Sequence, residues 1–112
     1  MPGQHTLTFT DRAFADDVLD ANVPVLVEFW ASSCKPCRAL LPVIDHVARD
    51  YVGVLRVGTI DVDDNRRIPK TFEIEALPTL LLFRNGRVVA RLGDGASKAT
   101  IAEMIERHLV PA

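Results

Sequence analysis

The sequence predicts an α/β domain with a central mixed β-sheet of about five strands, flanked by about four helices. Strand-like and helix-like segments alternate through most of the chain, a pattern typical of parallel strands covered by helices on both faces. Two consecutive strands near the C-terminus are joined by Asn85-Gly86, which favours a tight antiparallel hairpin. Because 112 residues ordinarily fold around one core, we expect residues 1–112 to form a single domain.

The first quarter of the chain is interpreted as strand, helix and strand. His5 to Thr10 alternates polar and apolar residues and predicts a short edge strand. Thr10 can cap a following helix, Asp11 suits the positive end of its dipole, and Asn22-Val23-Pro24 ends it. Val25 to Trp30 is a nearly continuous apolar run of β-formers, which predicts a central strand buried on both faces.

The longest helix is predicted from Cys34 to Tyr51. Pro42 lies inside it and should kink the axis, because proline lacks a backbone donor. One apolar stripe runs along this helix: Leu40, Leu41, Ile44, Val47, Ala48 and Tyr51. A strand from Val54 to Asp61 follows, and then a short helix that Asp63 or Asp64 caps and Pro69 limits.

The C-terminal part predicts a hairpin and a final helix. The hairpin strands are Leu80 to Phe83 and Val88 to Leu92, and Gly93-Asp94-Gly95 forms the next turn. Ser97 can cap the last helix. The residues of that helix that face one way are Ile101, Met104, Ile105, His108 and Leu109.

Composition narrows the classes of partner. The net charge of −2 gives no reason to expect a nucleic acid or an anionic membrane as partner. No apolar stretch approaches the roughly 20 residues of a transmembrane helix. The N-terminal residues Met1 to His5 lack the features of a signal peptide, so we expect a cytoplasmic protein. In that compartment a purely structural disulfide is not expected.

Cys34 and Cys37 are the only cysteines, and they open the longest predicted helix. The free N–H groups and the positive dipole at a helix N-terminus favour thiolate over thiol. Thiolate is the attacking species in disulfide exchange, and a second cysteine one turn along can release the product. Pro36 is tolerated there because first-turn N–H groups lack helical partners.

Half of a zinc site is the alternative for this pair. Zinc would need two further ligands, and His5, His46 and His108 are scattered without ligand spacing, so redox chemistry is favoured and no metal or cofactor is expected. A dimer bridged by zinc through two cysteine pairs stays open. The segment Asp61-Val62-Asp63-Asp64 is interpreted as a solvated turn rather than a cation-binding loop.

Three further residues have two interpretations each. Glu28 interrupts the apolar run, so it is either a buried proton carrier, which we favour, or a strand-end residue that reaches water. Lys35 either acidifies Cys34 or is a solvated lysine with a screened effect. Trp30 either belongs to the core or is partly exposed beside the cysteine loop.

The sequence resembles the thioredoxin family from about Leu7 to Leu109. The motifs that carry the resemblance are Val27–Ala31, Cys34-Lys35-Pro36-Cys37, Leu77-Pro78-Thr79, and Asn85-Gly86 followed by Gly93. Together they are far more specific than the cysteine pair alone. The resemblance implies a thioredoxin fold and a dithiol protein that reduces disulfides in other proteins.

The resemblance also implies a role for individual residues. Cys34 would be the nucleophile, Cys37 the resolving thiol, and Glu28 the buried acid that assists proton transfer at Cys37. Pro78 matches a cis proline that faces the cysteines. The substrate-binding residues would be Trp30, Ser33, Lys35, Pro36, Leu77, Pro78 and Gly93.

The chain departs from the usual family pattern around the site. Ser33 stands in place of a tryptophan, Lys35 in place of a glycine, and Glu28 where aspartate is more common. Thr59 stands where many members carry a lysine near the buried acid, and the turn before the last helix is one residue longer. These differences bear on partner choice and redox potential rather than on the type of reaction.

We therefore predict a thiol–disulfide oxidoreductase, a protein-disulfide reductase that takes part in cell redox homeostasis. Its partners would be protein disulfide substrates and a separate thioredoxin reductase, because the chain has no glycine-rich nucleotide loop. We expect a monomer. The alternatives are an oxidant or isomerase, if Lys35 strongly stabilises the reduced form, and a non-catalytic binding or adaptor module.

Overall fold

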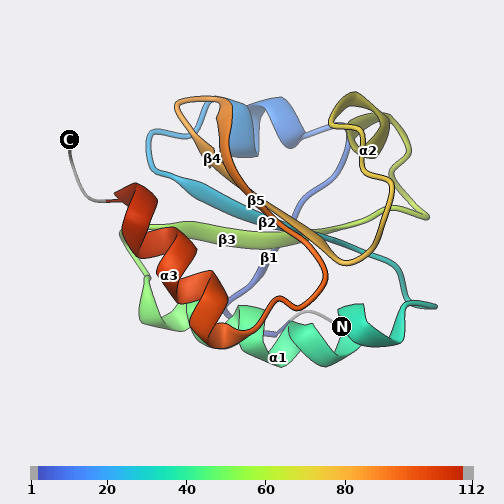
Figure 1. Ribbon diagram of the computed structural model, residues 1–112. Helices are drawn as coiled ribbons and strands as arrows, with labels where there is room; N and C mark the ends of the chain where they lie inside the picture. Colours follow the sequence, from blue (N-terminus) through green and yellow to red (C-terminus); the bar gives the residue numbers. More distant parts are fainter. Residues whose placement is uncertain (1–2, 110–112) are drawn as a thin grey trace.

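A computed structural model describes residues 3–109 (Figure 1). Its elements follow the predicted order of strands and helices. They are β1 (Leu7–Thr8), a π-helical segment η1 (Ala15–Leu19), β2 (Val25–Trp30), α1 (Lys35–Asp50), β3 (Arg56–Asp61), α2 (Arg67–Thr71), β4 (Thr79–Arg84), β5 (Arg87–Leu92) and α3 (Lys98–Leu109).

One five-stranded sheet forms the centre of the fold, in the order β1-β3-β2-β4-β5. β3 pairs in parallel with β1 and β2, whereas β4 pairs antiparallel with β2 and β5, which confirms the predicted mixed sheet. β1 lies at an edge, as its short alternating pattern predicts. All six residues of β2 are buried, as expected for the central strand.

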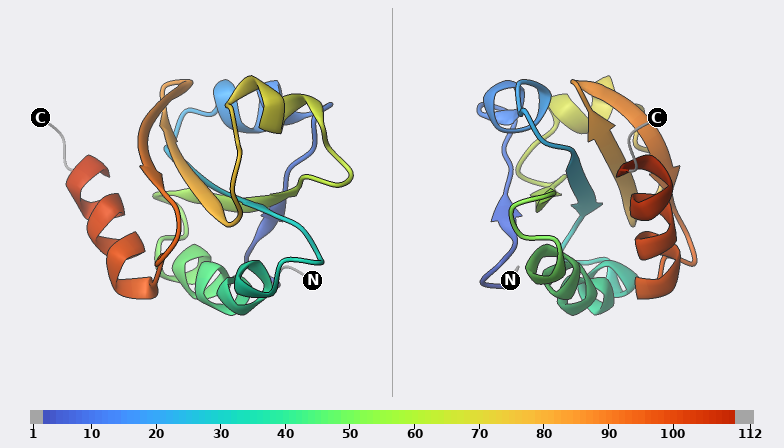
Figure 2. Two further views of the ribbon diagram at one scale, coloured as in Figure 1. Left: turned by 45° about the vertical axis from the view of Figure 1, so that its right-hand side comes forward. Right: turned by 90° about the vertical axis from the view of Figure 1, so that its left-hand side faces the viewer.

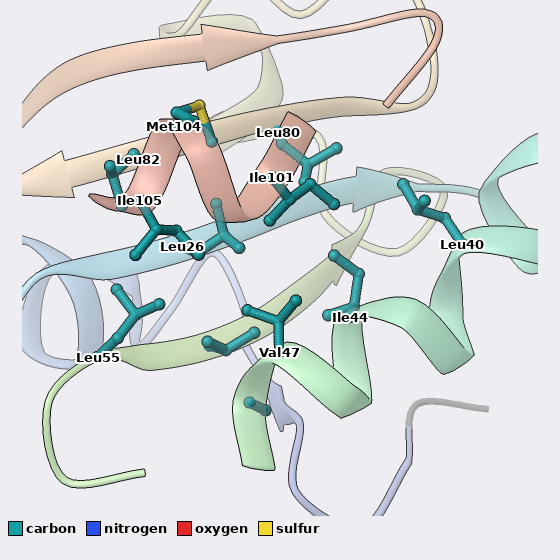
Figure 3. Packing of buried hydrophobic residues seen from close by; sticks show 12 residues of the cluster. Leu26, Leu40, Ile44, Val47, Leu55, Leu80, Leu82, Ile101, Met104 and Ile105 are labelled. Atoms are coloured by element: carbon teal, nitrogen blue, oxygen red, sulfur yellow. The ribbon is translucent and has the colours of Figure 1, made fainter. Parts of the chain in front are cut away.

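The helices cover both faces of the sheet, α1 and α3 on one face, η1 and α2 on the other (Figure 2). On the α1 and α3 side, Leu26 of β2 and Leu80 of β4 pack against Ile44, Ile101 and Ile105 (Figure 3). On the opposite side, the buried cluster is rich in aromatic rings: Phe9, Phe14, Phe29 and Phe83, with Phe72 packed against them. The apolar stripes predicted for the first and last long helices therefore face the core.

The first helix differs in type from the prediction. Thr10 does accept a hydrogen bond from the N–H of Ala13, at 3.2 Å. The helix that follows is a π-type turn, however, because the N–H of Asp20 donates to the carbonyl of Ala15, five residues earlier, at 2.8 Å. The wider turn still buries Phe14 and Val18 against the sheet.

The predicted cap and limit of α2 were wrong. The carboxylate of Asp11, rather than Asp63 or Asp64, accepts hydrogen bonds from the backbone N–H groups of Arg67 and Ile68, each at 2.9 Å. Pro69 lies inside the first turn, where its missing N–H leaves no helical bond unmade. A partner 57 residues away in sequence leaves no local pattern to detect.

The remaining turns and caps agree with the prediction. Asn85 and Gly86 have φ of 54° and 77°, the left-handed values that a tight hairpin turn requires. The hydroxyl of Ser97 accepts from the N–H of Thr100 at 3.2 Å at the start of α3. Pro42 lies inside α1, and the kink expected there stays a prediction. Within residues 3–109, no helix is long and apolar enough to span a membrane.

Candidate active site

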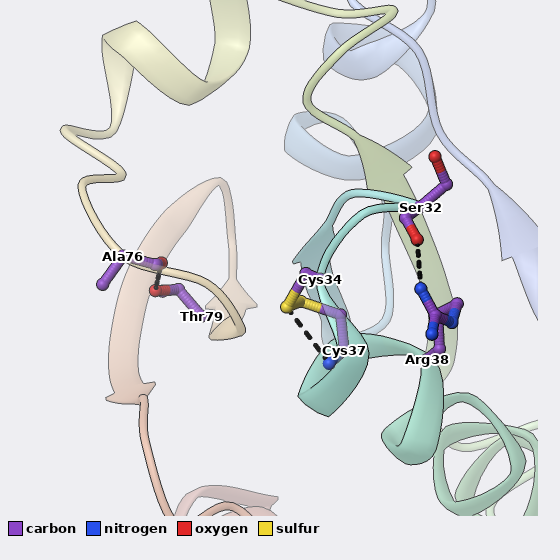
Figure 4. The surroundings of a disulfide bond; sticks show 6 residues. All are labelled: Ser32, Cys34, Cys37, Arg38, Ala76 and Thr79. Carbon is purple, nitrogen blue, oxygen red and sulfur yellow. Dashed lines mark hydrogen bonds between the residues drawn. A yellow bond between two sulfur atoms is a disulfide. The ribbon is translucent and has the colours of Figure 1, made fainter.

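The two cysteines lie where β2 passes into α1. Cys34 is the N-cap of α1 and Cys37 is in its first turn, and a disulfide joins them with Cα atoms 5.2 Å apart. The backbone N–H of Cys37 donates to the sulfur of Cys34 at 3.2 Å (Figure 4). The sulfur of Cys34 thus lies at the positive end of a 16-residue helix, with one backbone donor directed at it.

The two sulfur-bearing residues differ in access to solvent. Cys34 is half-buried, whereas Cys37 is fully buried, in a small cluster with Trp30 and Leu41. Only Cys34 can therefore be approached by a group on another molecule without movement of the chain.

Exposed residues surround Cys34. Ser33, Lys35 and Pro36 are all exposed. The guanidinium of Arg38 donates to the carbonyl of Ser32 in the same loop (Figure 4). Arg38 was not among the site residues predicted from the sequence. Its place three residues after Lys35 on a helix was the available signal, because that spacing brings side chains to one face.

The segment before β4 faces the disulfide from across the site (Figure 4). The Leu77–Pro78 peptide bond is cis, as the resemblance implied. Leu77 is half-buried and packs against the cluster of Trp30, Cys37 and Leu41, while Pro78 is buried. The hydroxyl of Thr79 donates to the carbonyl of Ala76 at 2.6 Å and so closes this turn.

The sheet register gathers the other candidate residues at one end of the sheet. Phe29 pairs with Thr79, and Leu92 pairs with Leu80. Trp30, Pro78 and Gly93 lie next to these pairs at the same end of their strands. Trp30 is only 9% exposed, so most of its ring belongs to the core. Gly93 is half-exposed, with open space where a Cβ would stand.

Glu28 is buried within the central strand. Its side chain is 0% exposed, which excludes the strand-end alternative. Neither carboxylate oxygen has a hydrogen-bond partner in the described part of the chain. Burial raises the pKa of Glu28 from 4.5 to about 8, because the charged form loses its hydration. Side chains alternate along a strand, so Glu28 shares the α1 face with Leu26 and Trp30.

Thr59 is the register partner of Glu28 on β3. It is 1% exposed, and its hydroxyl also lacks a hydrogen-bond partner among the described residues. The buried acid therefore has a neutral hydroxyl on the neighbouring strand, at the position where the resemblance would place a lysine.

A metal cluster is not found in the described structure. Within residues 3–109, no three His, Cys, Asp or Glu side chains come together in a way that could hold a metal ion. The described cysteines form a disulfide instead. The arrangement of the site is that of a reversible thiol pair with one accessible sulfur.

Comparison with known proteins agrees with this geometry. The thioredoxin family model matches residues 5–107. The chain is 40% identical to thioredoxin of Pseudomonas aeruginosa over 106 residues, which cover 95% of this chain and 98% of that protein. It is 39% identical to thioredoxin 1 of Nostoc sp. over 89% of this chain and 94% of the relative. Identity to thioredoxin of Mycobacterium bovis is 41%, over 86% of this chain and 83% of the relative. The chain therefore belongs to the thioredoxin family, and it is a thiol–disulfide oxidoreductase that reduces protein disulfides through its Cys34–Cys37 pair.

Proposed function

We propose that Cys34 is the attacking thiol and Cys37 the resolving thiol of this reductase. The Cys34 thiolate attacks one sulfur of a client disulfide, and the other client sulfur leaves as a thiolate that takes up a proton. Cys37 then loses its proton and attacks Cys34, which releases the second client sulfur. The client disulfide gains two electrons, and the Cys34–Cys37 pair loses two and becomes a disulfide.

The observation that carries this assignment is the contrast between the two cysteines. Cys34 is half-exposed at the N-terminus of α1, whereas Cys37 is fully buried. A client can reach only the first sulfur. The second is held within one helical turn of it, and this proximity favours rapid resolution of the mixed disulfide.

Glu28 is proposed as the proton carrier for Cys37. It lies on the sheet face that α1 covers, and its pKa of about 8 is close to the pH at which it would work. A group with such a pKa can accept a proton from Cys37 as that thiol attacks, and can return it when the disulfide is opened in the reverse direction. Burial keeps this proton from exchanging freely with solvent.

The client would bind over the surface around Cys34. The proposed contact residues are Trp30, Ser33, Lys35, Pro36, Leu77, Pro78 and Gly93. Of these, the exposed loop residues offer the largest accessible area, whereas Trp30 and Pro78 support the surface from within. Lys35 and Arg38 add positive charge on one side of Cys34, which would favour clients with acidic residues beside the disulfide.

We further propose that the chain works as a monomeric, single-domain carrier of electrons in the cytoplasm. Its reduced form would be regenerated by a separate thioredoxin reductase, since no glycine-rich nucleotide loop is present in the sequence. The relatives' family membership supports disulfide clients and such a reductase in general terms.

Equilibration of the Cys34–Cys37 pair in glutathione redox buffers tests the direction of transfer. A reductant is expected to have a potential below about −220 mV, the upper end of the cytosolic glutathione range. A potential above about −180 mV would instead favour an oxidant or isomerase, the alternative that positive charge at Lys35 and Arg38 would promote. The double variant Cys34→Ser, Cys37→Ser serves as the control, and it should lose all reductase activity.

A further inference from the structure

Three buried oxygen atoms at one place in the core have no hydrogen-bond partner among the described residues: both carboxylate oxygens of Glu28 and the hydroxyl oxygen of Thr59. Glu28 and Thr59 are direct register partners on the parallel strands β2 and β3. Register partners direct their side chains to the same face of a sheet, so these atoms share one environment beneath α1. Buried polar groups are nearly always hydrogen-bonded, and exceptions require a physical explanation.

We propose that Thr59 is a positioning residue for Glu28, and that its hydroxyl and the Glu28 carboxyl together bind one internal water molecule. A buried water needs two to four polar partners, and these three atoms can supply them. The hydroxyl can accept or donate, so it can serve the carboxyl in either protonation state. The inference rests on the proposed function only in so far as Glu28 is taken to carry the proton for Cys37.

The groups around Glu28 leave Thr59 as the principal polar neighbour of its carboxyl. On the same face of the sheet, Cys37 of α1 packs with Trp30 and is held in the disulfide, and the β4 register partner of Glu28 is the apolar Leu80. The residues of α3 that are buried on this face are apolar, among them Ile101 and Ile105.

The nearest charged residue along β3 on the same face is Asp61, which is half-buried and accepts a hydrogen bond from the N–H of Asp63 at 2.9 Å. The cation at the start of α3, Lys98, pairs with Asp50 at 3.6 Å. The register neighbour of Glu28 on β3 is therefore a neutral hydroxyl group, that of Thr59, rather than a cation.

The consequence is a specific effect of the Thr59 hydroxyl on the pKa of Glu28. Hydrogen bonds to a charged acceptor are stronger than those to a neutral one, so the hydroxyl and its water stabilise the carboxylate more than the carboxylic acid. Loss of the hydroxyl should raise the pKa of Glu28 further. A fixed hydrogen bond would also hold the carboxyl in one orientation, ready to exchange a proton with Cys37.

The test is a titration of the Glu28 carboxyl in the disulfide form of the protein, without any client. Carboxyl carbons are followed by NMR after labelling with ¹³C-glutamate, and Glu28→Gln assigns the signal by removing it. The other glutamates, Glu73, Glu75, Glu103 and Glu106, are all exposed, whereas Glu28 is buried. Thr59→Val deletes the hydroxyl with little change in shape, and Thr59→Ser retains it.

We expect Thr59→Val to raise the midpoint by roughly 0.5 to 1 pH unit, and Thr59→Ser to stay close to the parent protein. A crystal structure of the parent protein should show a water within hydrogen-bond distance of Thr59 Oγ1 and a Glu28 carboxylate oxygen. An unchanged midpoint in Thr59→Val, or no such water in the crystal, would overturn the proposal. The crystal structure decides the matter even if the valine variant does not fold.

A turnover measurement separates this inference from the proposed role of Glu28. If Glu28 carries the proton, the pH profile of kcat should move with the titration midpoint in Thr59→Val and be restored in Thr59→Ser. A midpoint that moves without any change in the profile would support the Thr59 proposal and contradict the catalytic role of Glu28.

Discussion

The backbone N–H of Cys37 is directed at the sulfur of Cys34, 3.2 Å away, at the N-terminus of α1. In the reduced protein the same donor and the helix dipole would stabilise a thiolate on Cys34. Cys37, by contrast, is buried in an apolar cluster with Trp30 and Leu41, which disfavours its thiolate.

Alkylation of the reduced protein should therefore label Cys34 first. The difference should be largest below neutral pH, where only the more acidic thiol has an appreciable thiolate fraction. The measurement is mass spectrometry of peptides after brief treatment with iodoacetamide at several pH values. Preferential labelling of Cys37 would reverse the assigned roles.

Lys35→Gly should make the cysteine pair more reducing. The charge of Lys35 stabilises the Cys34 thiolate and hence the reduced state, and its removal lowers the potential. One pH unit in thiolate pKa corresponds to about 30 mV for a two-electron couple, and because Lys35 is exposed, screening should keep the shift below that value. Lys35→Arg keeps the charge and is the matched control. Equal potentials for all three proteins would show that Lys35 is only a surface residue.

Glu28→Gln should stabilise the fold increasingly as the pH rises. The pKa of Glu28 is about 8 in the folded protein, against an ordinary value of 4.5. Below pH 4.5 the Glu28 carboxyl is protonated in both the folded and the unfolded chain, and its contribution to the stability of the fold is fully present. Between pH 4.5 and about pH 8, Glu28 is ionised only in the unfolded chain. The free energy of unfolding of the parent protein therefore falls by about 1.4 kcal/mol per pH unit relative to that of the glutamine variant.

Urea unfolding of both proteins between pH 5 and pH 8 measures this difference. The free energies of unfolding should diverge across the range, with the larger value for Glu28→Gln at the high end. Curves that stay parallel would show that Glu28 is ionised, and stabilised as such, in the folded protein.

Asp11→Ala should destabilise the protein by roughly 1–2 kcal/mol at neutral pH, the usual cost of losing a helix cap. Burial acts to raise the pKa of Asp11, but the backbone N–H groups of Ile68 and Arg67 and the charge of Arg67 outweigh it and lower the pKa. A lowered pKa means that the stabilisation is present above the ordinary value of 3.8 and is lost as the pH falls through the folded-state value.

Thermal unfolding of Asp11→Ala and of the matched control Asp64→Ala tests the cap. Asp64 is exposed, and it was a predicted cap for α2 that the structure does not support. The control should unfold at nearly the parent temperature at neutral pH. The difference between the parent and Asp11→Ala should shrink below about pH 3.8. Equal destabilisation by both substitutions would argue against the capping role of Asp11.

Asp11 also illustrates what the sequence could and could not predict about the fold. Elements with strong local patterns were predicted well: the apolar run of β2, the stripe of α1 and the Asn85-Gly86 turn all formed as expected. The cap of α2 was missed because the Asp11 carboxylate lies 57 residues before the N–H of Ile68 in sequence, so the two meet only through the tertiary fold. The π-type turn of η1 was missed because a segment of five residues is too short for its apolar spacing to distinguish an α turn from a π turn.

The site shows the same division between local and tertiary information. The cysteine spacing and the acid inside an apolar run are local signals, and both identified residues that the structure places in or beneath the site. The pairing of Glu28 with Thr59 depends on strand register, which no local pattern specifies. The isomer of the Leu77–Pro78 bond was expected only from the family resemblance, because cis is a minority state for such bonds in general.

The most direct test of the central claim is covalent trapping of clients by single-cysteine variants. In Cys37→Ser, Cys34 can still open a client disulfide, but serine is too poor a nucleophile to release it. The variant should therefore accumulate mixed disulfides, seen in cells as bands on non-reducing gels that vanish with reductant and are identified by mass spectrometry. Cys34→Ser lacks the first attacker and should form none. Equal trapping by both variants would contradict the assigned order of attack, and no trapping by either would contradict the exchange mechanism itself.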